Sequence, residues 1–190
     1  MMECNILIAG VGGQGTLLTS RILGAWAQGQ QLDTKISEVH GMAQRGGSVV
    51  THVRVGRQVY SPLVEPGEAD YILAFEELEA MRVLPYLKRG GKLVVNAQQI
   101  APMPVNMGVA KYPADALERL RGRADVLVVD ALKEALACGN AKAVNVVMVG
   151  VLAKRMGTEL EPWREAVRTC VPAKFLEVNL KAIEAGYALG

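Results

Sequence analysis

The sequence predicts an α/β fold of three layers: a Rossmann-like, mostly parallel β-sheet between helices, with an antiparallel hairpin and a helical C-terminal third. Three observations predict this class. Short apolar runs rich in β-branched residues alternate with helical periodicity up to about residue 130, which is typical of a sheet with helices on both faces. The loop Gly10–Gly15 follows the first apolar run and opens a helix. From Ala131 onward the apolar spacing is helical.

The composition indicates one globular domain, residues 1–190, because the chain shows no repeat, linker or low-complexity stretch. Hydrophobic residues make up 51% of the chain, which is enough for a core, and the net charge of +2 leaves no basic footprint for nucleic acid. The N-terminus does not resemble a signal peptide. The longest apolar run, Ala143–Ala153, is shorter than the ~20 residues of a membrane span. We therefore expect a soluble, cytoplasmic protein with neither a nucleic-acid nor a membrane partner.

Periodicity and turn residues place the individual elements. Strands are expected at Asn5–Ala9, Thr34–Val39, Ser48–Val55, Gln58–Leu63, Tyr71–Phe75, Lys92–Asn96 and Val126–Asp130. Helices are expected at Thr16–Gln28, Glu76–Leu87, Ala114–Arg121, Ala131–Ala137, Asn145–Met156, Glu161–Cys170 and Lys174–Ala188. Gly56-Arg57 joins two of the strands as a predicted hairpin over residues 48–63. Gly90-Gly91 is expected to close the second helix, and Pro162 suits the start of another.

The first glycine loop matches the pattern G-x-G-x-x-G over Gly10–Gly15, and Gly13 opens it further. Such a loop allows a tight turn and the close approach of a phosphate to a helix N-terminus. It equally allows a helix to pack closely on a sheet, and the sequence leaves both interpretations open. An acidic residue about 20 positions on would suit a dinucleotide, and Asp33 and Glu38 both lie near that offset. However, a polar loop and a hairpin replace the helical crossover that a dinucleotide fold needs.

A second unusual loop runs from Ser37 to Ser48 and contains His40, Gln44 and Arg45 between glycines. The glycines permit exposed backbone N–H groups, and an arginine fork suits a phosphate or a carboxylate. The loop follows a predicted strand, as the first glycine loop does, so the two could line one crevice. Alternatively, Arg45 could pair with Glu38, or the loop could be part of a protein interface.

The sequence contains no motif for catalysis within this chain. G-x-S-x-G, the P-loop lysine motif and H-E-x-x-H are all missing. The three cysteines, Cys4, Cys138 and Cys170, are scattered and form no C-x-x-C motif, so free thiols are expected in place of a zinc or iron–sulfur site. The acidic residues that follow Phe75 suit a helix start. If the protein belongs to an enzyme, the chemistry is expected on another chain.

Four segments resemble one family. They are GVGGQGT at 10–16, SEVHGMAQRGGSVVTHVRVG at 37–56, ADYILAFEELEAMR at 69–82 and PAKFLEVNLKAIEAGY at 172–187. In this order they resemble the gamma subunits of 2-oxoacid:ferredoxin oxidoreductases, and the form HGMAQRGG is most similar to the small (beta) subunits of the indolepyruvate enzymes. The resemblance extends over almost the whole chain.

The resemblance implies a subunit of an enzyme that converts a 2-oxoacid, coenzyme A and oxidised ferredoxin to acyl-CoA, carbon dioxide and reduced ferredoxin. It implies that thiamine diphosphate and iron–sulfur clusters lie on a large partner subunit, that coenzyme A is a co-substrate, and that ferredoxin is met through the hetero-oligomer. No catalytic residue and no metal ligand carry over. The residues implied to face ligand or partner are Gly12, Gly13, Gln14, Gly15, His40, Gln44 and Arg45.

Two other functions remain open from the residues alone. The chain could be an independent Rossmann-type nucleotide-binding protein, because the glycine fingerprint stands in the expected context. It could also be a scaffold or interaction module that uses the same loops only for protein contact. Tight binding of NAD or FAD by the isolated chain would favour the first of these. A neighbouring gene for a large chain with thiamine and ferredoxin-type motifs would favour the oxidoreductase subunit.

Overall fold

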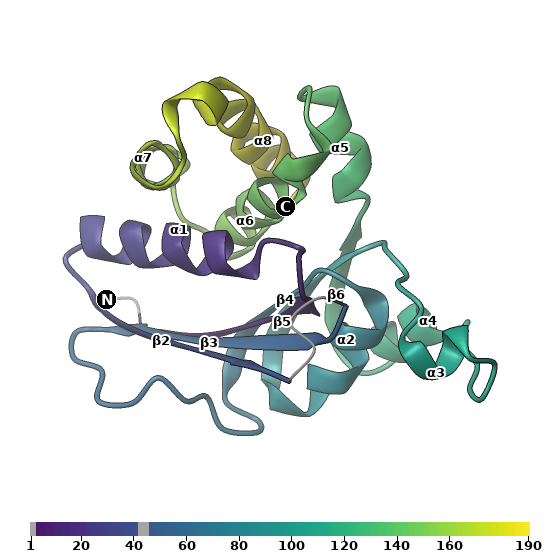
Figure 1. Ribbon diagram of the computed structural model, residues 1–190. Helices are drawn as coiled ribbons and strands as arrows, with labels where there is room; N and C mark the ends of the chain where they lie inside the picture. Colours follow the sequence, from purple (N-terminus) through teal and green to yellow (C-terminus); the bar gives the residue numbers. More distant parts are fainter. Residues whose placement is uncertain (1–2, 42–45) are drawn as a thin grey trace.

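The computed structural model describes residues 3–41 and 46–190, and its elements form three layers (Figure 1). A six-stranded sheet in the order β2-β3-β1-β4-β5-β6 is the central layer. The strands are β1 (Cys4–Val11), β2 (Asp33–His40), β3 (Ser48–Gly56), β4 (Ala69–Ala74), β5 (Leu87–Asn96) and β6 (Asp125–Val129). Strands β1, β4, β5 and β6 are parallel, whereas β3 runs antiparallel to both β1 and β2. The predicted α/β class, with a mostly parallel sheet and an antiparallel hairpin, is confirmed.

Helices cover both faces of the sheet. They are α1 (Thr16–Gly29), α2 (Glu77–Val83), α3 (Met103–Asn106), α4 (Ala116–Arg121), α5 (Ala131–Ala137), α6 (Val144–Arg155), α7 (Glu161–Cys170) and α8 (Leu176–Leu189). Figure 1 shows α1 and α5–α8 above the sheet and α2–α4 below and beside it. No helix within the described ranges combines the length and the apolar character that crossing a membrane requires.

The antiparallel hairpin is formed by different strands from those predicted. It consists of β2 and β3, with Val39 opposite Val50, and residues 41–47 connect them. The segment Gln58–Leu63 is not a strand. The reason is that β1 and β2 already occupy both edges of β3, so a further strand has no edge of β3 to pair with. The segment is held instead by side chains, as where Val59 N donates to Asp33 Oδ2 at 2.9 Å.

The predicted helix Glu76–Leu87 is shorter than expected. Helix α2 ends at Val83 and continues as a single 3₁₀ turn, Leu84–Tyr86, that contains Pro85. Proline lacks the N–H that another turn of α-helix would need. Strand β5 therefore begins earlier than predicted, at Leu87, and Gly90-Gly91 lies inside it and not at a helix end. Helix α3 was not predicted, and the other elements begin and end within a few residues of their predicted bounds.

Two hydrophobic cores hold the three layers together, one on each face of the sheet. The larger core lies under α1 and the C-terminal helices, where the rings of Trp26 and Trp163 stack with centroids 4.4 Å apart. Trp163 is fully buried, and its Nε1 donates to Thr158 Oγ1 at 2.9 Å. The stacked pair joins α1 to α7, so the helical C-terminal third is part of the same core as the sheet.

Helices α6 and α8 pack backbone against backbone. A Cβ at Gly186 would lie 1.9 Å from the carbonyl oxygen of Val147, and one at Gly150 would lie 2.3 Å from that of Ile183. Real Cβ atoms do not come this close to a carbonyl oxygen. Both positions therefore require glycine, and the distance between the two helices depends on them.

We expect the change Gly186→Ala to force α6 and α8 apart and to destabilise the protein by about 1–3 kcal/mol, the typical cost of overpacking a core. Gly29→Ala in α1 is the matched control, because no described atom lies within 4 Å of a Cβ at that position. Urea unfolding of the two variants beside the parent chain measures the difference. Equal free energies of unfolding for Gly186→Ala and the parent would show that the two helices have room to move.

Candidate functional site

The two loops singled out in the sequence meet at the carboxyl ends of the parallel strands. Gly12 N donates to Gly47 O at 2.9 Å, and Gly46 N donates to Gly12 O at 3.3 Å. These bonds extend the ladder of β1 and β3, in which Val11 lies opposite Ser48. The start of the helix after β1 and the start of β3 therefore form one surface. Gln44 and Arg45 lie outside the described residues, so their roles stay predictions.

One hollow on this surface, here called the histidine-side hollow, has a volume of about 440 Å³. It is lined by Gly12, Gly13, Gly15, Thr16, Leu17, Glu38, His40 and Val49. The structure thus brings together four of the seven predicted residues. His40 is exposed, and its Nδ1 lies 3.0 Å from Gly41 O. A carbonyl oxygen can only accept, so Nδ1 is the donor in that contact.

The acidic residue beside the glycine loop is Glu38 and not Asp33. Glu38 Oε2 accepts from Thr16 Oγ1 at 3.3 Å and from Thr51 Oγ1 at 3.1 Å. Asp33 lies at the other end of β2, where it pairs with Lys35 at 2.7 Å. A carboxylate at the mouth of the histidine-side hollow repels an anion and suits a hydroxyl or amide donor.

A second hollow, here called the lysine-side hollow, lies on the other flank of the glycine loop and has a volume of about 490 Å³. It is lined by Gly13, Gln14, Gly15, Gln98, Leu132, Ala141, Lys142 and Val144. Lys142 is its one charged lining residue and is exposed. The anionic part of a ligand that crosses the glycine loop is therefore better accommodated on this flank than beside Glu38.

The glycines of the first loop serve two purposes. Gly15 has φ +87°, and a Cβ there would lie 2.7 Å from Asn145 Nδ2 on α6, so this glycine allows close packing. Gly13 has φ +105°, and no described atom lies within 4 Å of where its Cβ would be. Gly13 also lines both hollows. The packing interpretation therefore applies to Gly15, whereas for Gly13 exposure to a ligand stays a prediction.

Gln14 connects the loop to the neighbouring strands. Its Oε1 accepts from Val11 N at 2.6 Å, and its Nε2 donates to Phe75 O at 3.1 Å and to Gln98 Oε1 at 3.0 Å. Asn96, 1% exposed, donates through Nδ2 to Gln98 Oε1 at 3.2 Å. The side chain of Gln14 is thus largely engaged by the protein, although the residue borders the lysine-side hollow.

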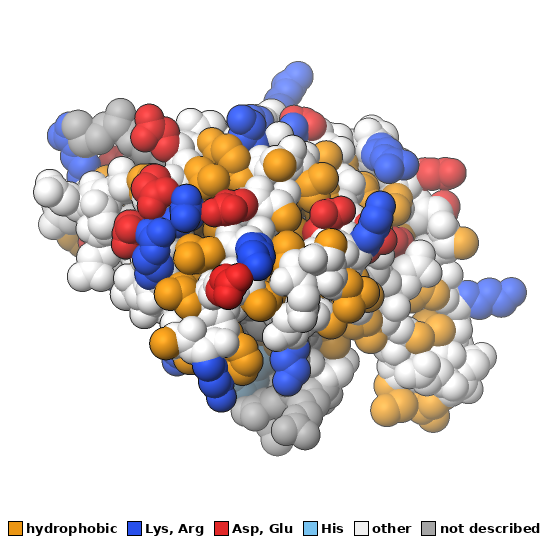
Figure 2. All heavy atoms as spheres, turned by 90° about the horizontal axis from the view of Figure 1, so that it is seen from above, with side chains coloured by type: hydrophobic (Ala, Val, Ile, Leu, Met, Phe, Trp, Pro, Cys, Tyr) orange, Lys and Arg blue, Asp and Glu red, His pale blue; other side chains and the backbone are white. Residues whose placement is uncertain are grey.

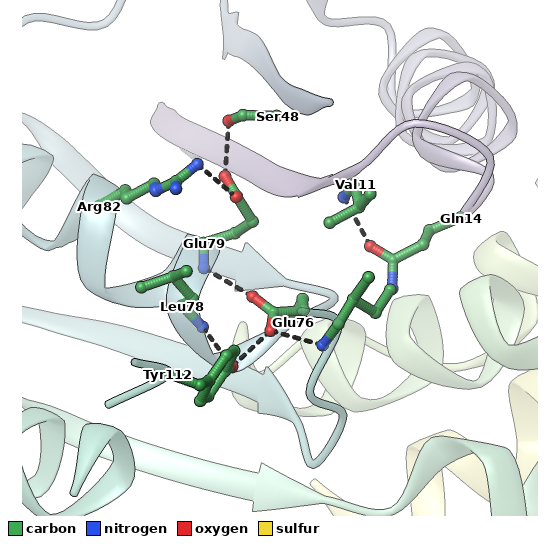
Figure 3. A network of polar contacts seen from close by, with 9 residues as sticks. Val11, Gln14, Ser48, Glu76, Leu78, Glu79, Arg82 and Tyr112 are labelled. Atoms are coloured by element: carbon green, nitrogen blue, oxygen red, sulfur yellow. Dashed lines mark hydrogen bonds and ion pairs between the residues drawn. The ribbon is translucent and has the colours of Figure 1, made fainter. Parts of the chain in front are cut away.

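Below this edge lies a buried network centred on Glu76, which was expected only as a helix-start residue (Figure 3). Glu76 is 1% exposed and caps α2, because its Oε2 accepts from Glu79 N at 2.9 Å. Its Oε1 accepts from Ile100 N at 3.0 Å and from the hydroxyl of Tyr112. The structural interpretation of this residue is confirmed. No local pattern in the sequence indicates the contacts to Ile100 and Tyr112, which are distant from Glu76 in the chain.

Glu79 carries the network to the start of β3. Its Oε2 accepts from Ser48 Oγ at 2.5 Å, and its Oε1 accepts from Arg82 Nη1 at 2.8 Å. Burial raises the pKa of Glu79 above its usual value, although the Ser48 hydrogen bond and the Arg82 charge act in the opposite direction. Burial and the bond to Glu76 raise the pKa of Tyr112, so its hydroxyl stays protonated and able to donate.

The cysteines do not fit a metal or an iron–sulfur cluster. Cys4 is 5% exposed, and burial raises its pKa to about 12. Burial also raises the pKa of Cys138 and of Cys170. A cluster needs thiolates held close together, and within the described ranges no three His, Cys, Asp or Glu side chains are grouped to hold a metal ion.

Comparison with known sequences identifies a family. Residues 5–189 match the family model described as pyruvate ferredoxin/flavodoxin oxidoreductase. The curated proteins named indolepyruvate oxidoreductase subunit IorB in Thermococcus kodakarensis and Pyrococcus horikoshii are 42% and 43% identical over 192 residues. Each alignment covers 98% of this chain and 95% of the relative.

Solved structures show the same fold. The gamma subunit of a keto/oxoacid ferredoxin oxidoreductase from Geobacter sulfurreducens superposes with a TM-score of 0.74 at 23% identity, over 97% of this chain and 96% of that one. The 2-oxoglutarate:ferredoxin oxidoreductase from Magnetococcus marinus, solved with 2-oxoglutarate, coenzyme A and succinyl-CoA, gives a TM-score of 0.73 at 18% identity. That match covers 100% of this chain but only 31% of the longer one.

We expect Glu79→Gln to change how stability depends on pH. A carboxyl group whose pKa is raised by folding opposes folding as it ionises, so its contribution is lost as pH rises above the ordinary glutamate pKa of about 4.3. The free energy of unfolding of Glu79→Gln, relative to the parent, should therefore increase between pH 4 and pH 7 in urea titrations. Glu159→Gln, at an exposed position, is the control. A difference that is constant or falls with pH would contradict the expectation.

Proposed function

The chain belongs to the pyruvate ferredoxin/flavodoxin oxidoreductase family, and from this membership we propose that it is the small, accessory subunit of a 2-oxoacid:ferredoxin oxidoreductase acting on indolepyruvate or another aryl pyruvate. The observation that carries the proposal is the 42–43% identity to indolepyruvate oxidoreductase subunits over nearly the whole of both chains. In the implied reaction the 2-oxoacid loses carbon dioxide, its acyl carbon is oxidised and transferred to coenzyme A, and the electrons reduce ferredoxin.

The catalytic centre belongs, in this proposal, to a large partner subunit. Thiamine diphosphate would supply the decarboxylation chemistry there, and iron–sulfur clusters would conduct the electrons. The described residues of this chain offer neither accessible thiolates nor a group of metal ligands. Residues 1–190 would act as one gamma-type domain in a cytoplasmic hetero-oligomer and meet ferredoxin only through that complex.

What this chain contributes is a surface beside the glycine loop. We place coenzyme A or the partner subunit against Gly12, Gly13, Gln14, Gly15 and His40, and we extend this to Gln44 and Arg45 by their place in the sequence. The two hollows differ in charge, since one has Glu38 in its lining and the other Lys142. Coenzyme A is strongly anionic at its phosphate end, so this end is expected nearer Lys142. A coenzyme A ligand in the Magnetococcus marinus protein supports the assignment of the ligand.

The isolated chain is expected to be colourless and inactive. A visible spectrum and an assay of 2-oxoacid-dependent dye reduction, run on the chain alone and with the large subunit added, measure this. Turnover should require both chains, and indolepyruvate should be oxidised faster than pyruvate. Iron–sulfur absorbance or turnover by the isolated chain would contradict the accessory role.

The lysine-side hollow is tested by Lys142→Ala in the reconstituted enzyme. An exposed charge interaction is worth up to about 1 kcal/mol, so the KM for coenzyme A should rise about two- to fivefold with kcat little changed. Arg89→Ala is the matched control. It removes a positive charge near the start of β5, at the end of the parallel strands opposite to the glycine loop. Gly13 is a poor choice for this test, because its φ of +105° would strain any side chain. Equal KM values for the two variants would remove Lys142 from the proposed site.

A further inference from the structure

An uncharged arm projects from the body of the protein between β5 and α4. It comprises residues 98–110, includes the short helix α3, and contains no Asp, Glu, Lys or Arg. Figure 1 shows this segment standing out to one side of the sheet, next to α4. Charged residues make up 21% of the chain, so an exposed stretch of this length without any is unusual for a solvated loop.

The end of the arm is apolar. Met103, Met107 and Val109 are 68%, 69% and 74% exposed, and they lie within seven residues of one another in the chain. Figure 2 shows a lobe that stands apart from the main body and carries hydrophobic side chains at its end. Clustered exposed apolar side chains mark interaction surfaces, and methionine is enriched in interface cores. Its flexible thioether also adapts to the shape of a partner.

The arm is held in place at both of its ends by the start of α2. Near the first end, Ile100 N donates to Glu76 Oε1 at 3.0 Å, and Gln99 Nε2 donates to Glu77 Oε2 at 2.9 Å. Just beyond the second end, the Tyr112 hydroxyl donates to Glu76. The same hydroxyl accepts from the backbone N–H of Leu78 in α2, at 3.1 Å. A buried carboxylate is costly unless several donors satisfy it, and here it accepts from both ends of the arm. An arm ordered before it meets a partner loses less entropy on binding.

The arm starts at the same sheet edge as the glycine loop. It follows the carboxyl end of β5, and its first residue, Gln98, accepts from Gln14 Nε2 at 3.0 Å. The glycine loop, the two hollows and the arm therefore form one continuous edge of the molecule. This is the edge that the proposed function directs towards the large subunit.

We propose that the apolar arm anchors this chain to the large subunit by inserting Met103, Met107 and Val109 into an uncharged, apolar cleft of that subunit. The proposal rests on the proposed function for the identity of the partner. The lack of charge on the arm excludes recognition of an acidic or a basic surface by its tip. In the Magnetococcus marinus enzyme the matching region is 31% of a longer chain, so there this fold shares its polypeptide with a large remainder. In the proposed complex the large subunit is a separate chain, which a non-covalent anchor must hold.

The test measures the affinity of this chain for the purified large subunit by calorimetry. Met107→Glu and Val109→Asp each place a charge on the exposed tip, where neither change disturbs the core. Each should weaken binding at least about tenfold, or 1.4 kcal/mol. Met107→Leu should bind within about twofold of the parent chain. Tyr60→Glu is the matched control, because Tyr60 is 85% exposed and lies beside the start of β1, at the opposite edge.

Three results would overturn the anchor. If the parent chain binds the large subunit and both tip variants bind equally well, the arm is not the anchor, although the proposed function stands. If the parent chain does not bind the large subunit, both proposals fail. If the parent chain forms dimers that the tip variants abolish while affinity for the large subunit is unchanged, the arm contacts a second copy of this chain. Thermal unfolding of every variant confirms that a loss of affinity does not reflect a loss of fold.

Discussion

The antiparallel pairing of β3 with β1 is the constraint on which the candidate site depends. Because β3 runs against β1, its first residue, Ser48, lies opposite the last residue of β1, Val11. The glycine loop after β1 is thereby hydrogen-bonded to the two residues that precede β3. Gly12 donates to Gly47 O and accepts from Gly46 N. In a dinucleotide-binding half the neighbour of the first strand is parallel and reached by a helical crossover. Here the antiparallel neighbour β3 brings two glycine-rich loops together at the carboxyl end of β1. The helical crossover of a dinucleotide-binding half is replaced by this arrangement.

The same pairing joins the site to the polar network beneath it. Ser48 begins β3 and also donates to Glu79 on α2, while the preceding Glu76 binds the segment that includes the arm. A second connection is the hydrogen bond from Gln14 in the glycine loop to Gln98, the first residue of the arm. Each buried polar group in these two routes has a partner, so the network fixes one geometry. Buried Glu76 and Glu79, together with the partly buried Ser48, Gln14 and Gln98, therefore connect the loop surface to the arm.

The sequence was informative where the signal is local. Periodicity and glycine positions were sufficient for the order of strands and helices, and the G-x-G-x-x-G context located the site. Strand pairing is non-local, so the sequence could not show that β2 pairs with β3 and that Gln58–Leu63 therefore has no partner strand. Asp33 and Glu38 were indistinguishable by their offset from the glycine loop. They lie near opposite ends of one strand, and only the direction of that strand decides that Glu38 borders the hollow. The role of Glu76 was partly hidden for the same reason, because its partners Ile100 and Tyr112 are distant in the chain.

The chemistry of the described residues at this edge agrees with the proposed accessory role. The buried Glu76 and Glu79 accept from backbone N–H groups, hydroxyls and Arg82, and the Tyr112 hydroxyl stays protonated. Elsewhere in the chain, burial raises the pKa of each cysteine. Among the described residues, this edge presents to a neighbour exposed glycine backbone, Glu38, His40, Lys142 and the apolar arm. In the proposed function these groups bind and position a ligand or a partner. A module of this kind can be a separate subunit or part of a longer chain, because its contribution depends on where its edge lies relative to the catalytic centre. Between separate chains that placement must come from surface contacts, such as the proposed contact of the uncharged arm beside the glycine loop.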